Sequence, residues 1–96
     1  MENAGWVLVR SVDAGVFAGF FVSREGNVVK LRNARRIWYW DGAATLSQLA
    51  MEGTSNPGNC KFPVPVPEIV VLGVCEIIPM TDRAVQSIRD VPEWRA

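Results

Sequence analysis

The sequence predicts a single α+β domain, spanning residues 1–96, in which an antiparallel β-sheet packs against two helices. In the first forty residues, segments rich in β-branched and aromatic side chains alternate with short turns that contain Asp and Gly. Two later segments carry apolar residues at helical spacing. No repeat, linker or low-complexity tract divides the chain, and its length is sufficient to bury one core.

The predicted strands are residues 5–12, 16–24, 28–31, 35–40 and 68–79. Turns at residues 13–15 and 25–27 join the first three as hairpins. Gly19, in the middle of the second segment, indicates either a bulge or a close approach of backbone. The segment 68–79 is apolar for most of its length, which predicts a central strand buried on both faces. Glu76 interrupts it, either at an edge facing water or, as we favour, paired with an arginine.

The predicted helices are residues 43–52 and 81–89. Thr45 and Gln48 have the spacing of a capping box, and Gly53 is placed to end the first helix in a left-handed cap. Thr81 is the predicted N-cap of the second helix. Between the helices, residues 54–67 contain four prolines, which predicts an ordered extended loop.

Composition excludes several classes of function. Ten cationic and ten anionic side chains cancel, which argues against broad binding to duplex nucleic acid. Histidine is absent, so no Ser–His or Cys–His nucleophile exists within one chain. Cys60 and Cys75 lack the paired spacing of a zinc site, and we expect small buried thiols, no metal and no cofactor. Without a leader or an apolar run of roughly 20 residues, the chain is expected to be soluble and intracellular.

The segment 31–40, LRNARRIWYW, is the strongest functional signal, because three arginines lead directly into three aromatic rings. Guanidinium groups match phosphate oxygens, and aromatic faces stack on flat heterocycles, so the segment predicts a receptor for a phosphate-bearing ligand with a base. The competing interpretation is that Trp38 and Trp40 face the core while the arginines are solvated or paired. Arg35 and Arg36 point to opposite faces of a strand, which favours a pocket between subunits.

Phe62, beside Lys61 in the proline-stiffened loop, is the candidate ring for stacking on a base, with simple packing as its alternative. No carboxylates are paired at the spacing of a catalytic motif, and no phosphate-binding loop is present, so an enzyme is not predicted. Alternatives to a ligand-binding protein are a nucleotide hydrolase, a binder of single-stranded nucleic acid and a structural component of a virion.

The sequence resembles the Thoeris anti-defence protein 1 family of phage sponge proteins over nearly the whole chain. Three blocks carry this resemblance: residues 33–54 (NARRIWYWDGAATLSQLAMEGT), 60–66 (CKFPVPV) and 11–20 (SVDAGVFAGF). The resemblance implies a homo-oligomer without enzymatic activity that sequesters cyclic ADP-ribose isomers made by bacterial Toll/interleukin-1-receptor-domain enzymes. Some members also hold cyclic oligonucleotides at a separate site. The chain would then be a phage protein in the cytoplasm of the infected bacterium.

The same resemblance implies which residues bind the ligand. In the family, arginines grip the diphosphate, while an aromatic ring and an arginine flank the adenine. These roles would fall on Arg10, on Arg35 or Arg36, on Phe62 and on Arg89. Which arginine contacts which group is left open.

Overall fold

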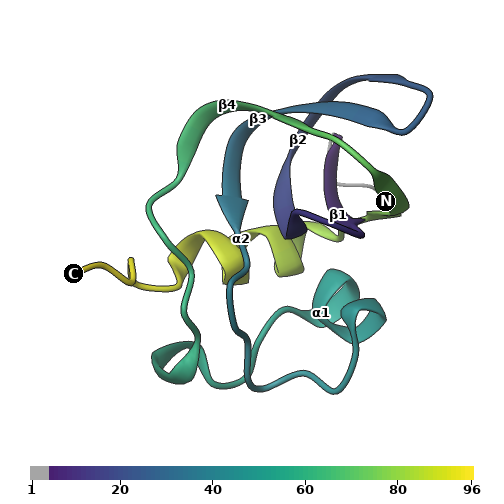
Figure 1. Cartoon of the computed structure of the whole chain (residues 1–96). Coiled ribbons are helices and arrows are strands. Elements are labelled where there is room, and N and C mark those ends of the chain that lie inside the picture. The colour runs from purple at the N-terminus through teal and green to yellow at the C-terminus, as the bar shows by residue number, and fades with distance from the viewer. Residues whose placement is uncertain (1–4) are drawn as a thin grey trace.

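The structure is a computed structural model that describes residues 5–96, and it confirms the α+β class. Its strands form one antiparallel sheet in the order β4-β3-β2-β1-β5, and both α-helices lie together on one side of it (Figure 1). The elements are β1 (Trp6–Ser11), β2 (Gly15–Glu25), β3 (Val28–Arg36), α1 (Leu46–Glu52), the short 3₁₀ helix η1 (Pro57–Asn59), β4 (Val66–Val71), β5 (Val74–Pro79) and α2 (Asp82–Asp90).

The first three strands follow the predicted hairpins. Gly19 lies both at a bulge and at a close approach of backbone, the two features that its position indicated. The bulge is seen in the pairing of β2 with β3, which shifts register between Ala18 and Phe20. A Cβ atom at Gly19 would lie 3.1 Å from the carbonyl oxygen of Arg32. The close approach of β3 therefore requires a residue without a side chain at this point.

The single central strand predicted for residues 68–79 is wrong. Gly73, with φ of 69°, interrupts it after Leu72 and separates β4 from β5. β4 pairs with β3 and β5 pairs with β1, so the two halves form the opposite edges of the sheet. Because only two residues join these edges, the sheet must curl round on itself, and the Ser11 hydroxyl fastens the junction by donating to the Leu72 carbonyl at 2.6 Å. β4 also begins inside the predicted loop, since an edge strand tolerates Pro67.

Two apolar clusters lie on the two faces of the sheet. The first fills the space between the sheet and the helices, and the second lies on the opposite face, inside the curl. Alternation along β1 supplies both, because Leu8 faces the helices and Val9 faces the other way. The largest fully buried side chains are Phe17, Phe62, Leu8, Leu31, Leu49, Met80, Ile88, Val9, Val29 and Val71.

Both helices have the predicted N-caps. The Thr45 hydroxyl accepts a hydrogen bond from the Gln48 amide, and the Gln48 side chain accepts one from the Ala44 amide. Gly53 ends α1 with positive φ, 77°, but its ψ of −157° lies outside the left-handed helical region that was predicted. The helix begins three residues later than predicted. Thr81 caps α2. None of the helices within residues 5–96 is long and apolar enough to cross a membrane.

The strand predicted for residues 35–40 is also wrong beyond Arg36, where β3 ends. The chain then leaves the sheet and pairs briefly with the proline-rich loop, through two backbone hydrogen bonds between Tyr39 and Lys61. Trp40 packs against the helix-side core as the competing interpretation expected, whereas Trp38 is exposed.

The two cysteines differ. Cys60 is buried as predicted, but Cys75 is exposed, because β5 is an edge strand rather than a central one. Glu76, its neighbour in β5, is paired with Arg10 as favoured, and the pair is exposed at the edge.

Candidate functional site

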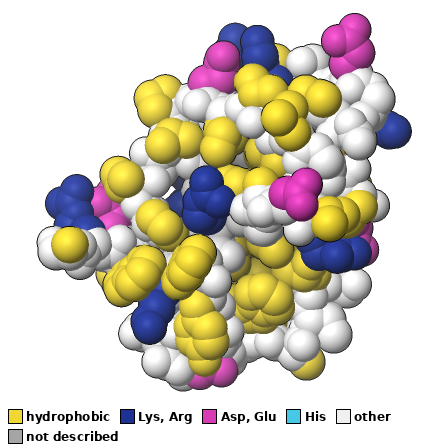
Figure 2. Space-filling model, viewed as in Figure 1, with side chains coloured by type: hydrophobic (Ala, Val, Ile, Leu, Met, Phe, Trp, Pro, Cys, Tyr) yellow, Lys and Arg dark blue, Asp and Glu magenta, His cyan; other side chains and the backbone are white. Residues whose placement is uncertain are grey.

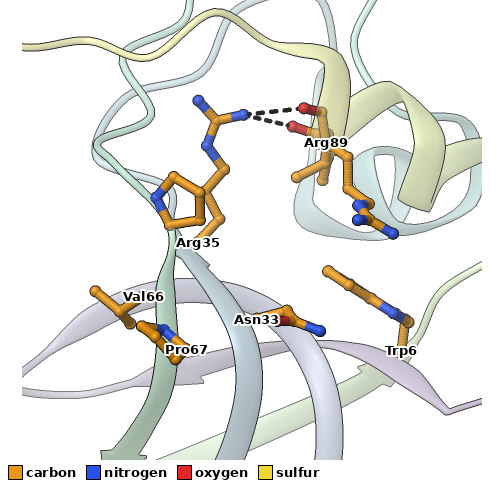
Figure 3. A pocket seen from close by; sticks show the side chains of 8 residues that line it. Trp6, Asn33, Arg35, Val66, Pro67 and Arg89 are labelled. Atoms are coloured by element: carbon orange, nitrogen blue, oxygen red, sulfur yellow. Dashed lines mark hydrogen bonds between the residues drawn. The ribbon is translucent and has the colours of Figure 1, made fainter.

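A pocket of about 370 Å³ opens where the end of α2 meets one end of the sheet. The first residue of β1, the bulged part of β3, the start of β4 and the last turn of α2 form its walls. Figure 3 shows Arg89 above Trp6 on one side and Val66 with Pro67 on the other. We call this the Arg89 pocket, and its lining residues are Trp6, Asn33, Arg35, Pro65, Val66, Pro67, Ile88 and Arg89.

Asn33 lies between the two sides of the pocket, in a backbone conformation that most residues avoid (Figure 3). Its φ is 52°, which makes it the only residue other than glycine with positive φ among residues 5–96. Asparagine tolerates this left-handed conformation better than most side chains do. The conformation accompanies a bulge of β3 against β2, where Ala18 pairs with Arg35 and Phe20 with Arg32, whereas the pairing of β3 with β4 keeps its register across Asn33.

Arg35 is buried and acts as a clamp between the sheet, the loop and α2. Its Nη1 donates to the carbonyl oxygens of Ile88 and Arg89 at 3.0 and 3.4 Å, while Nε and Nη2 donate to those of Pro63 and Phe62 at 3.2 Å each. Burial lowers the pKa of Arg35 from its ordinary value, although a guanidinium remains charged. The cation thus satisfies carbonyls at the negative end of α2, which is a structural task.

Arg89 differs from Arg35, because its side chain is exposed and its guanidinium carbon lies 5.5 Å from the centre of the Trp6 ring. Within residues 5–96, no ion pair involves Arg89. A guanidinium held over an indole at the mouth of a pocket retains donors for a phosphate oxygen. The Trp6 ring itself is largely buried, so it supports the guanidinium, and the arrangement can hold an anionic ligand at the pocket mouth against the proline side.

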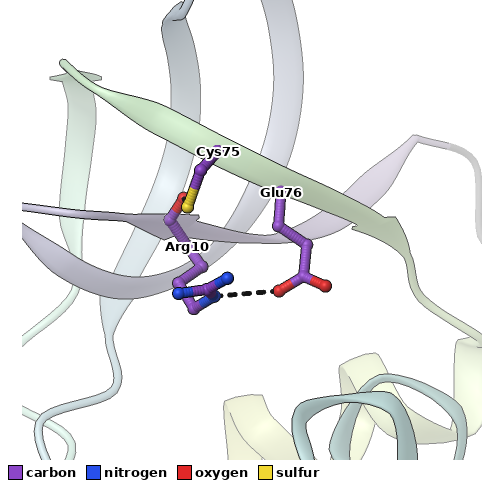
Figure 4. A network of polar contacts seen from close by, with 3 residues as sticks. All are labelled: Arg10, Cys75 and Glu76. Atoms are coloured by element: carbon purple, nitrogen blue, oxygen red, sulfur yellow. Dashed lines mark hydrogen bonds and ion pairs between the residues drawn. The ribbon is translucent and has the colours of Figure 1, made fainter.

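The other two predicted arginines lie elsewhere. Arg36 points to the opposite face of the sheet from Arg35, as predicted, where it covers the Phe17 ring at 4.5 Å and donates to the Ala14 carbonyl. Arg10 pairs with Glu76 across β1 and β5, with 3.0 Å between Nε and Oε1 (Figure 4). This hydrogen bond raises the pKa of Arg10. Of the predicted arginines, the structure therefore brings only Arg35 and Arg89 together in one pocket.

Phe62 does not match the stacking role predicted for it. Its ring is completely buried in the helix-side core, and the Arg35 guanidinium lies 5.6 Å from its centre. The proline-rich loop turns this side chain inward, so no face of the ring is open to a ligand. The alternative of simple packing describes Phe62 in this structure.

Sequence reasoning missed Trp6 and Asn33. Trp6 reads as an ordinary strand residue, and only the fold brings it beside Arg89. Asn33 does carry a local signal, because an asparagine within a strand pattern marks a position for left-handed backbone. Among residues 5–96, no three His, Cys, Asp or Glu side chains are grouped as metal ligands.

Comparison with known proteins identifies one family. No curated protein and no solved structure matches the chain. A model of a domain of unknown function, DUF6948, matches residues 5–88, which includes all five strands and most of α2. The chain therefore belongs to the DUF6948 family.

Proposed function

We propose that this protein binds a cyclic ADP-ribose isomer in the Arg89 pocket and sequesters it without cleaving it. It would act as a phage anti-defence protein in the cytoplasm of the infected bacterium. The observation that carries this proposal is the exposed guanidinium of Arg89 over the Trp6 ring, at the mouth of a pocket with a rigid proline wall. The resemblance to the Thoeris anti-defence protein 1 family supports the choice of ligand.

The pocket suits retention of a ligand. A charge-assisted hydrogen bond from Arg89 to a phosphate contributes about 1.5–3 kcal/mol, and burial of apolar ligand surface against the proline wall contributes about 25 cal/mol per Å². Pro65 and Pro67 restrict the backbone of the facing wall, so little conformational entropy is lost there on binding. These contributions require no group that transfers a proton or attacks a bond.

A homo-oligomer is part of the proposal. The volume of the Arg89 pocket, about 370 Å³, is near the lower end of the range for small-molecule sites. Arg10 and Arg36 lie outside it in the same chain. A second copy that covers the pocket mouth would enlarge the site and supply further donors, and light scattering of the purified protein measures whether such a copy is present.

Isothermal titration calorimetry with a cyclic ADP-ribose isomer tests the site. We expect Arg89→Ala to weaken binding by about 1.5–3 kcal/mol, which corresponds to roughly 10- to 150-fold. Arg83→Ala is the matched control, since Arg83 is an exposed arginine of α2 that does not line the Arg89 pocket. A cyclic oligonucleotide titrated in parallel tests the other class of ligand that the resemblance suggests.

Mass spectrometry of the ligand released by boiling distinguishes sequestration from hydrolysis. We expect the ligand to be recovered intact. Recovery of cleaved ligand would show that the protein is an enzyme and would contradict sequestration. Equal affinity of the Arg89→Ala and Arg83→Ala variants would show that the ligand does not bind in the Arg89 pocket.

A further inference from the structure

Three exposed aromatic rings form a surface outside the Arg89 pocket. Trp38, Tyr39 and Trp94 are 64%, 47% and 45% exposed, and we call them the aromatic platform. None of the three lines the Arg89 pocket. Figure 2 shows apolar side chains gathered on the lower left of the visible face, with basic side chains among them. Large aromatic side chains that are exposed to solvent and grouped in one patch are typical of a surface that binds a partner.

The geometry of the platform suits flat ligands with negative charge. The rings of Trp38 and Trp94 stack on one another, with 13° between their planes and 6.3 Å between their centres, so a ligand reaches only the faces turned away from this contact. The Lys61 ammonium lies 5.9 Å from the centre of the Tyr39 ring and 5.6 Å from that of Trp94. Within residues 5–96, Lys61 forms no ion pair with a carboxylate. A base can therefore stack on an indole while its phosphate approaches the ammonium.

Backbone hydrogen bonds hold the platform in place. The Tyr39 and Lys61 backbones exchange two hydrogen bonds, of 3.2 and 2.8 Å. The Trp94 amide donates to the Phe62 carbonyl at 3.0 Å, and the Phe62 side chain is anchored in the core. Three segments distant in sequence are thus fixed before a ligand arrives, which reduces the entropy lost on binding.

We propose that the aromatic platform is a second site, independent of the Arg89 pocket, that binds single-stranded nucleic acid. Bases stack on the exposed ring faces of Trp38 and Trp94, and Lys61 contacts a phosphate of the same strand. The net charge of zero is compatible with this site, because stacking rather than a wide basic face supplies the affinity.

Charge also favours nucleic acid over a second copy of the chain as the occupant. A symmetric contact between two platforms would bring the same patch of each copy together. Both Lys61 ammonium groups, each lying against two rings of its platform, would then be buried in one desolvated interface without a carboxylate partner among the ion pairs of residues 5–96. A phosphate neutralises the same ammonium.

Fluorescence anisotropy with a labelled oligodeoxythymidylate of about ten nucleotides, within the usual range of single-strand sites, tests the proposal. We expect Trp38→Ala and Trp94→Ala each to weaken binding by about 5- to 150-fold, the loss of one stacked base. Binding should quench tryptophan fluorescence. Because Lys61 meets one phosphate, the slope of log affinity against log salt should be about −0.7.

Met51→Ala is the matched control, since it removes another exposed apolar side chain, on α1, away from the platform. Lys61→Glu is a second variant that leaves the rings intact, and it should abolish the salt dependence together with most of the affinity. Absence of oligonucleotide binding by the wild type, or equal affinity of the tryptophan and Met51 variants, would overturn the proposal. A shift from dimer to monomer in light scattering of Trp38→Ala, without oligonucleotide binding, would assign the platform to self-association instead.

Discussion

Two adjacent arginines show how completely the surroundings decide what a residue does. Arg35 is buried and donates to four backbone carbonyls, whereas Arg36 is exposed and covers the face of Phe17. Since successive side chains of a strand alternate, their opposite directions follow from sequence alone. Which of the two faces holds the end of a helix does not, because α2 lies more than forty residues further along the chain.

Arg35→Lys should destabilise the fold although it keeps the charge. A lysine ammonium lacks the planar fork that reaches Phe62, Pro63 and Ile88 together, so buried carbonyls lose their donors. We expect a loss of about 1–3 kcal/mol in the free energy of unfolding, measured by urea denaturation. Arg36→Lys, on the exposed neighbour, should change stability by less than about 0.5 kcal/mol. Equal effects of the two substitutions would contradict the clamp.

Phe62 and Cys75 mark what residue-level reasoning could not reach. An aromatic ring in a proline-rich loop is compatible with exposure or with burial, and only the path of the loop decides between them. Cys75 lies in an apolar run typical of a buried strand, yet β5 forms an edge of the sheet and leaves the thiol exposed. In both cases the missing information is the position of the segment relative to distant parts of the chain.

At the scale of elements, boundaries with a local chemical cause were predictable. The helix caps at Thr45, Gly53 and Thr81 follow from side chains or a backbone conformation within one turn. The break at Gly73 was missed, because a glycine inside an apolar run also fits a continuous strand. The predicted strand 68–79 breaks at Gly73 because its first half pairs with β3 and its second half with β1. A local sequence pattern does not specify which strands will pair.

Gly53 and Gly73 provide a matched pair of substitutions. Both have positive φ, but only Gly53 is crowded, since a Cβ atom there would overlap the side chain of Ser87 on α2. We expect Gly53→Ala to cost about 2–5 kcal/mol, from strained backbone and overpacking together. Gly73→Ala, whose Cβ atom would make only ordinary van der Waals contacts with Ser11 and Asp13, should cost about 1–2 kcal/mol. Thermal unfolding measures both, and the reverse order would contradict the packing of α1 against α2.

The loop before α1 is predicted to respond to acid. The Asp41 carboxylate accepts hydrogen bonds from the Asn59 side chain, the Gly42 amide and the Asn56 side chain, and these lower the pKa of Asp41. Its contribution to stability is therefore present above the unfolded pKa of about 3.9 and lost as the pH falls through the folded pKa. Asp41→Asn should lower the Tm near neutral pH, and the difference from wild type should shrink below about pH 4. A difference that stays constant with pH would contradict the assignment.

On the scale of the whole molecule, curling of the sheet creates the candidate pocket. β4 and β5 are two halves of one chain segment at opposite edges of the sheet, and α2 follows β5 directly. The end of α2 reaches the start of β1, where Arg89 meets Trp6. Because four elements supply the walls, the pocket exists only in the folded chain. For this reason the sequence could indicate that arginine and aromatic side chains bind the ligand, but it could not indicate which of these side chains lie together in one pocket.

Because the Arg89 pocket exists only in the folded chain, ligand binding is expected to stabilise the entire domain. A ligand of the folded state alone, at a hundred times its Kd, adds about 2.7 kcal/mol to the free energy of unfolding. For a domain of this size each kcal/mol raises the Tm by about 4–8 °C, so a cyclic ADP-ribose isomer should raise it by roughly 10–20 °C. Differential scanning fluorimetry measures the shift. Arg83→Ala should retain the shift. Arg89→Ala at the same ligand concentration should lose about half to nine-tenths of it, since binding that is 10- to 150-fold weaker leaves the concentration at about 10 to 0.7 times Kd. An equal shift in both variants would place the ligand outside the Arg89 pocket, and no shift in the wild type would exclude this ligand.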